Sequence, residues 1–266
     1  MDISRISTCT YPMREKDIDY ALGVCAEAGF KKADVWGRAP HFSEDQSQCD
    51  WPALKQTAAE LGIAVANLGT YPGSFFIAAT DGQREAEMCK MKAAIEGAAY
   101  FGARSIRVSP GHGEDPAIVD RVTPYFIEAA AYAAEKNVYL GMENHRGSIA
   151  GNPQVVAELC RNVNSPHFGV IYEPCNLLAI EVDYKQALDT LGDWVVHTHI
   201  KDGTWESGEY QRVHLGDGDV DFVWVVEQLE GAGYEGDYAL EYEVGNIEPV
   251  ETGMSKWYDR FTAAFN

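Results

Sequence analysis

The feature that most constrains how this chain folds is a repeated alternation of short apolar runs with longer segments of helical periodicity. In one helical segment, Met88, Met91 and Ile95 recur at the spacing that places apolar side chains on one face of a helix. Strands that alternate with helices are typical of parallel sheets, because a parallel pair needs a long crossover connection. We therefore expect eight parallel strands, at residues 3–9, 32–36, 64–68, 105–109, 139–143, 168–172, 195–200 and 238–242.

The length of the chain favours closing these strands into a barrel. Eight strand-helix units over 266 residues are about 33 residues each, which suits an α/β fold with a single (β/α)8 TIM barrel over residues 1–266. An open dinucleotide-binding sheet is disfavoured, since no GxGxxG follows the first expected strand. Several helical segments end in glycine just before the next strand, as at Gly29 and Gly102. We expect Pro124 in the first turn of the fourth helix, with Thr123 as the N-cap.

The charge balance limits the kind of partner that the protein binds. Lysine and arginine number 21 against 41 aspartate and glutamate residues, a net charge of −20 that repels nucleic acid and anionic membranes. No apolar stretch approaches the roughly 18 residues of a membrane span, and the first residues lack a signal-peptide pattern. The six cysteines contain no CxxC pair, which suits a reducing compartment. We therefore expect a cytoplasmic protein that binds a small molecule and has no nucleic-acid or membrane partner. A homo-oligomer is compatible with this composition.

Acidic and imidazole side chains follow four consecutive expected strands. Catalytic residues of a (β/α)8 barrel lie at the carboxyl ends of its strands. Carboxylates and imidazoles are rarely placed at buried positions unless they are paired or coordinated. Three carboxylates with one imidazole suit a divalent cation such as Mn²⁺, Mg²⁺, Co²⁺ or Zn²⁺. The residues at these strand ends are Glu143 and His145, then Glu173, then His199 and Lys201, and finally Glu241 and Glu243.

Several segments carry a resemblance to a known family. The chain resembles the xylose isomerase-like TIM-barrel family of sugar phosphate isomerases and epimerases at residues 142–145, 172–176, 197–202, 215–222 and 233–241, and more weakly at 35–41. The resemblance implies that Mn²⁺ is the commonest ion and that the metal ligands are Glu143, Glu173, His199 and Glu241. The family usually has aspartate where this chain has Glu173. The alternative is therefore that Glu173 contacts the metal ligands and does not bind the ion itself.

Two reactions are compatible with these residues. In the first, an isomerase or epimerase of a ketose or keto-sugar forms a metal-stabilised enediolate, with Glu143 and Glu241 moving the proton on opposite faces of the substrate. In the second, a lyase, dehydratase or hydratase acts on a keto-sugar, keto-inositol or 3-keto-glycoside, with His145 or Lys201 protonating the leaving oxygen. Family members that act on cyclic ketones have similar Glu-x-His and His-x-Lys pairs, and Ile149 stands where ketose 3-epimerases of the family have glutamate. The non-enzymatic alternative is a barrel that has lost its metal site and serves in binding or as a subunit.

Further residues near the expected strand ends are candidate substrate contacts. Trp36 suits stacking on a sugar ring or packing in the core, and an inward Arg107 suits orienting substrate or pairing with a metal-bound carboxylate. Arg212 and His214 lie on an expected long loop, residues 202–220, that can close over substrate. The full set of expected contacts is Trp36, His41, Arg107, His112, Asn176, Arg212 and His214.

Overall fold

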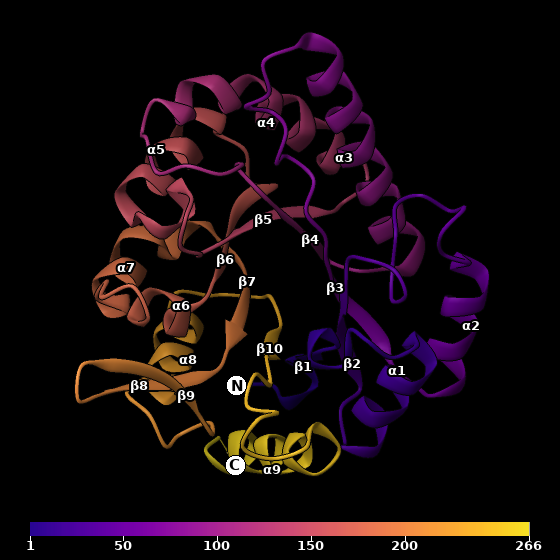
Figure 1. Ribbon diagram of the computed structural model, residues 1–266, viewed down its shortest axis with the longest axis vertical. Coiled ribbons are helices and arrows are strands. Elements are labelled where there is room, and N and C mark those ends of the chain that lie inside the picture. The colour runs from indigo at the N-terminus through magenta and orange to yellow at the C-terminus, as the bar shows by residue number, and fades with distance from the viewer. Residues whose placement is uncertain (266) are drawn as a thin grey trace.

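Eight parallel strands close into a barrel in the computed structural model, which describes residues 1–265 (Figure 1). This architecture confirms the predicted fold class. The last barrel strand pairs with both the seventh and the first, so the sheet has no open edge. In chain order the barrel strands are β1 (Ile6–Cys9), β2 (Lys32–Trp36), β3 (Ala64–Gly69), β4 (Ser105–Val108), β5 (Tyr139–Glu143), β6 (Phe168–Tyr172), β7 (Val195–Ile200) and β10 (Tyr238–Leu240).

Helices cover the outside of the barrel and bury one apolar face against it. Phe126 of α4 and Phe168 of β6 pack with ring centroids 4.9 Å apart, and both side chains are buried. The predicted glycine caps are present: Gly29 and Gly102, for example, both have positive φ at the end of a helix, three residues before the next strand begins. The α-helices are α1 (Ile18–Glu27), α2 (Trp51–Glu60), α3 (Asp81–Phe101), α4 (Ile118–Glu135), α5 (Pro153–Val163), α6 (Pro174–Leu178), α7 (Tyr184–Leu191), α8 (Phe222–Gly231) and α9 (Val250–Ala263). Short 3-10 turns lie at Ile3–Arg5, Tyr11–Met13, Ile149–Gly151 and Gly192–Trp194.

Several details of the prediction were wrong. Residues 3–5, expected at the start of the first strand, form a 3-10 turn, so β1 begins at Ile6. Pro124 lies inside α4, which begins at Ile118 with Ala117 as its N-cap. The buried face that continues from Val122 to Phe126 outweighs the missing proline hydrogen bond. The expected long loop after β7 contains a hairpin of β8 (Asp202–Glu206) and β9 (Glu209–Val213), which extends from the barrel beside α6 (Figure 1).

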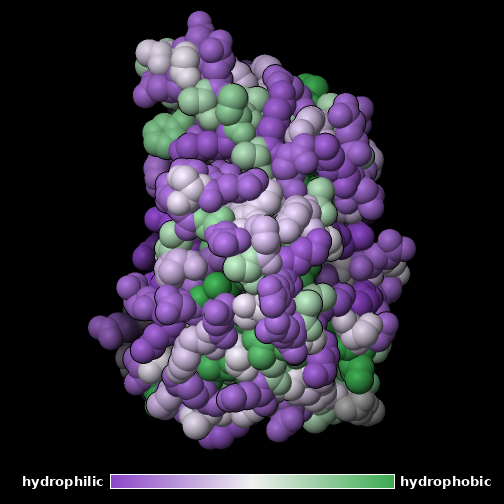
Figure 2. All heavy atoms as spheres, turned by 90° about the vertical axis from the view of Figure 1, so that its right-hand side faces the viewer, coloured by the Kyte–Doolittle hydropathy of each residue, from purple (hydrophilic) through white to green (hydrophobic). Residues whose placement is uncertain are grey.

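The exterior is largely polar. The face of the molecule in Figure 2 is mainly hydrophilic, with apolar side chains distributed among polar ones. Across residues 1–265, none of the helices combines the length and the apolar character that a membrane crossing requires.

Candidate active site

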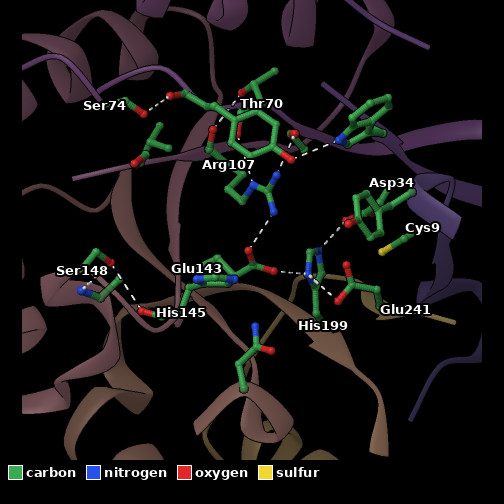
Figure 3. Close-up of a pocket in the computed structure, with 18 of the residues that line it drawn as sticks. Cys9, Asp34, Thr70, Ser74, Arg107, Glu143, His145, Ser148, His199 and Glu241 are labelled. Atoms are coloured by element: carbon green, nitrogen blue, oxygen red, sulfur yellow. Dashed lines mark hydrogen bonds and ion pairs between the residues drawn. The ribbon is translucent and has the colours of Figure 1, made fainter. Parts of the chain in front are cut away.

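A cavity of about 380 Å³ opens at the carboxyl end of the barrel strands (Figure 3). This volume lies in the range of about 300–1,000 Å³ that small-molecule sites occupy. Its inner wall includes Glu143 at the end of β5, His199 on β7 and Glu241 just after β10. The strand ends that the sequence singled out therefore meet at one cavity.

Four of the predicted residues converge on a single point. Glu143, Glu173, His199 and Glu241 are all buried, and each offers one ligand atom within 4.8 Å of the others. Glu173 does not line the cavity and is fully buried behind it. Its Oε2 forms no hydrogen bond with the described residues and has only an ion-pair contact with Lys201 Nζ at 3.4 Å. Buried carboxylate oxygens are almost always bonded, so this atom suits coordination to a cation. The donor set fits Mg²⁺, Mn²⁺ or Zn²⁺.

The imidazole of His199 is oriented by contacts at both ring nitrogens. Nδ1 lies 2.7 Å from Glu143 Oε1 and 3.9 Å from Glu241 Oε2, whereas Nε2 lies 3.1 Å from Asp34 Oδ2. The same Asp34 oxygen accepts a hydrogen bond from His197 Nε2 at 2.9 Å. Burial opposes the charge of Asp34, but the two histidines outweigh it and hold the pKa of this carboxyl well below its usual value. A carboxylate that fixes the far nitrogen of a histidine is typical of metal sites.

A chain of hydrogen bonds beneath the cavity holds Asp34 in place. Asn67 Nδ2 donates to Asp34 Oδ2 at 3.1 Å, and Ser105 Oγ donates to Asn67 Oδ1 at 2.8 Å. Ser7 Oγ lies 3.4 Å from the other Asp34 oxygen. These side chains come from β1, β2, β3 and β4, so the barrel itself fixes the carboxylate.

Arg107 forms a buried ion pair with Glu143. Its Nη1 lies 2.7 Å from Glu143 Oε2, and the guanidinium also donates to the carbonyl oxygens of Gly69 and Thr70 at 3.2 Å each. Burial would raise the pKa of Glu143, but Arg107 and His199 outweigh it and keep the pKa well below normal. Arg107 is thus engaged with a candidate ligand, one of the two roles expected for it.

Lys201 lies among three carboxylates at the other side of the cluster. Its Nζ contacts Glu241 directly and lies 2.9 Å from Glu243 Oε2 and 3.4 Å from Glu173 Oε2. Burial opposes the charge of Lys201, but the carboxylates keep its pKa well above normal, so the amine stays protonated. Burial also raises the pKa of Glu173, to about 7, against the attraction of Lys201. Glu173 Oε1 accepts a hydrogen bond from Cys175 N at 3.1 Å and caps α6.

The β8–β9 hairpin brings Arg212 to the cavity. Arg212 Nη2 lies 3.1 Å from both Asn176 Oδ1 and Glu243 Oε2, and Nη1 donates to Tyr210 at 2.8 Å. Asn176 Nδ2 in turn donates to the carbonyl oxygen of Asn144 at 3.0 Å. Arg212 and Asn176 both line the cavity, as their predicted role requires.

Two other expected contacts, Trp36 and His112, also line the cavity, as does the expected catalytic residue His145. Trp36 is half-buried, and its Nε1 donates to the hydroxyl of Tyr71 at 3.0 Å. His112 and His145 are exposed at the mouth. His145 Nδ1 lies 2.9 Å from the carbonyl oxygen of Arg146, so this nitrogen donates and Nε2 is the nitrogen left for chemistry.

Two expected contacts, His41 and His214, lie outside the cavity, where the structure gives them other partners. His41 is fully buried, with Nδ1 2.8 Å from Thr10 Oγ1 and Nε2 near the carbonyl oxygens of Met13 and Lys16. It fastens the segment after β1 to the β2–α2 connection. His214 instead accepts a hydrogen bond from Trp257 Nε1 of α9 at 3.1 Å. Neither histidine lines the cavity.

Sequence reasoning did not assign a role to several residues that line this cavity, among them Arg38, Asp34, Tyr71, Arg146 and Glu243. A signal exists for two of them. Asp34 lies two residues before Trp36 on β2, and Glu243 lies two residues after Glu241, so each shares a face with a residue that was singled out.

The family model described as xylose isomerase-like TIM barrel matches residues 22–260. The chain belongs to this family. Proteins with similar sequences include protein MJ1311 of Methanocaldococcus jannaschii, 24% identical over 56% of this chain and 54% of that protein. L-ribulose-5-phosphate 3-epimerase UlaE of Escherichia coli is 27% identical over 50% of this chain and 46% of that enzyme. The chain spans about half the length of these curated relatives.

Solved structures share the fold over nearly the whole chain. A xylose isomerase-like TIM barrel protein of Mycobacterium smegmatis in complex with magnesium has a TM-score of 0.78 at 16% identity, covering 98% of both chains. The IOLI protein with a zinc atom has a TM-score of 0.78 at 14% identity, covering 98% of this chain and 97% of that one. The probable 3-DHS dehydratase AsbF of Bacillus anthracis has a TM-score of 0.77 at 15% identity, covering 97% and 98%.

Proposed function

We propose that this protein is a divalent-metal-dependent isomerase or epimerase of a ketose or keto-sugar. The observation that carries the proposal is the convergence of Glu143, Glu173, His199 and Glu241 within 4.8 Å beside a cavity of small-molecule size. These four residues would hold the ion. Mn²⁺ is the first candidate, and the magnesium and zinc found in structures of the same fold support Mg²⁺ and Zn²⁺ as alternatives.

The reaction begins with removal of a proton from the carbon next to the substrate carbonyl. When bound, the ion supplies Lewis-acid stabilisation of the oxygen on which negative charge develops. Glu241 takes the proton as a carboxylate, and the C–H electrons move toward the carbonyl. Glu143 passes a proton taken up from solvent to the opposite face of the carbon, which inverts its configuration, and Glu241 then releases the abstracted proton to solvent.

The surrounding cations keep both glutamates in position for this transfer. Arg107 and His199 each hold one oxygen of Glu143, at 2.7 Å. Lys201 contacts Glu241 and remains protonated, so it serves as a hydrogen-bond donor and positive charge rather than as the base. Both glutamates contact or approach His199. Glu241 follows β10, which pairs with β7, whereas Glu143 ends β5, which β6 separates from β7.

The lyase or dehydratase reaction is the second candidate, and His145 supports it. This reaction needs an acid at the leaving oxygen, and His145 lines the cavity mouth with Nε2 unbonded by the described residues. Product mass separates the two reactions, because only the second changes the composition of the substrate.

Deuterium incorporation tests the proposal. A panel of ketoses, inososes and 3-keto-sugars is incubated in D₂O with Mn²⁺-loaded protein and analysed by mass spectrometry, with an EDTA-treated control. The isomerase proposal predicts deuterium uptake at unchanged composition that EDTA abolishes. Loss of water or of an aglycone would overturn it in favour of the lyase, and uptake that survives EDTA would overturn metal dependence.

A further inference from the structure

The cavity is divided into a charge-balanced inner part and a cationic rim. The acidic residues that line it are Asp34, Glu143, Glu241 and Glu243. Each of these carboxylates is bonded to a histidine, lysine or arginine. The rim carries only cations and imidazoles, namely Arg38, His112, His145 and Arg146, all of them exposed. In a chain of net charge −20, a rim free of carboxylates is unexpected by composition alone.

Arg38 is held in position while its hydrogen-bond donors remain free. Its guanidinium carbon lies 4.3 Å from the ring centroid of Tyr71, whose hydroxyl is bonded to Trp36 Nε1. Stacking on an aromatic ring orients an arginine without using its N–H groups. Among residues 1–265, the guanidinium of Arg38 has no hydrogen bond or ion pair within 4.0 Å, so it is preorganised to receive an anion.

The backbone around Arg38 is fixed by close packing of two loops. Gly37 N donates to the carbonyl oxygen of Gly69 at 3.0 Å, which continues the pairing of β2 with β3. A Cβ on Gly37 would lie 2.4 Å from the Cα of Thr70, so only glycine allows this approach. The approach brings Arg38 beside Tyr71, the residue after Thr70.

Tyr71 also connects Arg38 to the inner part of the cavity. The guanidinium carbon of Arg107 lies 4.2 Å from the same ring centroid, and Arg107 pairs with Glu143 (Figure 3). Arg38 and Arg107 therefore both contact the ring of Tyr71, and Arg107 also contacts the candidate metal ligand Glu143. One small molecule can reach both points in a cavity of about 380 Å³.

Arg146 is the second rim arginine without a partner carboxylate, and it lies on the wall formed by the β4–α4 and β5–α5 connections. These two connections are joined by a bridge between Gly113 and Ser148, which places His112 near His145 and Arg146. Among the residues that the structure describes, no carboxylate lies within 4.0 Å of the Arg146 guanidinium. The nearby Glu114 is outside the cavity lining, where its Oε1 accepts a hydrogen bond from Gly147 N at 3.2 Å.

We propose that the substrate is an anion whose carboxylate or phosphate group binds at the cationic rim, at Arg38 or at Arg146, while its carbonyl end reaches the inner carboxylates. This inference rests on the proposed function for the carbonyl end of the substrate. The rim proposal adds that neutral ketoses are poor substrates, because the rim arginines bind a negative charge at the end of the substrate away from its carbonyl. Arg212 and Arg107 do not supply this recognition, because carboxylates of the site already engage them.

Calorimetry with three small probes tests the rim without requiring turnover. Glycerol 3-phosphate, glycerate and glycerol are titrated into the Mg²⁺-loaded full chain and into the variants Arg38→Gln and Arg146→Gln. Arg161→Gln is the control, because Arg161 is exposed on α5 and lies outside the cavity. Any coordination of a probe to Mg²⁺ is common to all variants, so differences report the arginines.

The proposal predicts that at least one anionic probe binds more tightly than glycerol, and that loss of a rim arginine weakens it about tenfold or more. Tighter binding of glycerol 3-phosphate indicates a phosphate site, and tighter binding of glycerate indicates a carboxylate site. A loss in only one variant supports the proposal and assigns the anion to that arginine. Equal affinity for anions and glycerol, or affinities unchanged in both variants, would overturn it.

Its failure is distinguishable from failure of the proposed function. If neutral ketoses exchange deuterium in D₂O and the anions do not bind, the rim proposal is wrong while the isomerase proposal stands. The deuterium assay is therefore repeated with phosphorylated and carboxylated keto-sugars. If neither these nor the neutral compounds exchange deuterium, but the anionic probes bind through Arg38 or Arg146, the rim proposal stands and the proposed reaction is wrong.

Discussion

Asp34 and His199 are joined by a bond of 3.1 Å between a carboxylate oxygen and Nε2, and this bond directs Nδ1 of the imidazole toward Glu143. The histidine is therefore held in the orientation that a metal ligand needs before any ion binds. Asp34 itself does not belong to the cluster of four candidate ligands around Glu143.

Substitution of Asp34 by asparagine should weaken metal binding. We expect a 10- to 100-fold loss of affinity for Mn²⁺, roughly the effect of removing a carboxylate that orients a histidine ligand. Calorimetric titration of Asp34→Asn with Mn²⁺ measures the change. The control Asp259→Asn alters an exposed aspartate of α9 and should leave the affinity unchanged. An unchanged affinity in Asp34→Asn would show that the bond does not prepare the site.

Replacing Lys201 by methionine should destabilise the metal-free protein. The change removes the cation shared by Glu173, Glu241 and Glu243, and leaves buried carboxylates without a partner. We expect the free energy of unfolding in EDTA to fall by about 3 kcal/mol. Added Mg²⁺ should restore part of the loss, since the ion replaces the missing positive charge.

Urea unfolding with and without Mg²⁺ checks this prediction. Lys256→Met provides the control, because Lys256 forms an exposed ion pair with Glu248 that contributes little stability. Equal losses in the two variants would mean that Lys201 does not balance the buried carboxylates.

Replacing His145 by alanine separates the two candidate reactions. If the glutamate pair moves the proton, loss of an exposed imidazole at the mouth should reduce the rate of deuterium exchange less than about tenfold. A general acid normally contributes about 100-fold or more. A loss of that size, measured by mass spectrometry together with a product that has lost water, would favour the dehydratase.

Replacing His41 by alanine should affect stability and leave substrate binding intact. The change leaves Thr10 and the carbonyl oxygens of Met13 and Lys16 without their partner inside the protein. We expect a loss of about 1–3 kcal/mol in the free energy of unfolding and an unchanged KM. A raised KM with unaltered stability would contradict this prediction and support a substrate contact at His41.

The sequence predicted the barrel because its signals are local. Helical periodicity and glycine caps such as Gly102 depend on neighbours along the chain. Inward positions at the strand ends follow from the two-residue alternation of a strand, which led to Glu143 and His199. A closed barrel then brings these ends together without further information from the sequence.

The role of Asp34 could not be predicted in the same way. Its partner His199 lies 165 residues away in the chain, and one acidic residue in a short apolar strand does not reveal that contact. The hairpin after β7 did have a local signal. Ser207 and Gly208 both have positive φ, as a two-residue hairpin turn requires, and a Ser-Gly pair between alternating residues is typical of such turns.

Pro124 shows how packing overrides a local preference. The residue favours the first turn of a helix, but the apolar side chains before it, including Ile118 and Val122, gain more by being buried in a longer α4. The end of a helix is therefore decided by contacts that the sequence around the proline does not report.

The most direct test of the account is a titration of the protein with Mn²⁺, followed by electron paramagnetic resonance of the free ion. The account predicts one Mn²⁺ per chain, and an affinity at least about 100-fold weaker in Glu241→Gln. The control Glu227→Gln, on the exposed face of α8, should bind as the unmodified chain does. Wild-type stoichiometry and affinity in Glu241→Gln would contradict the assignment of the metal site.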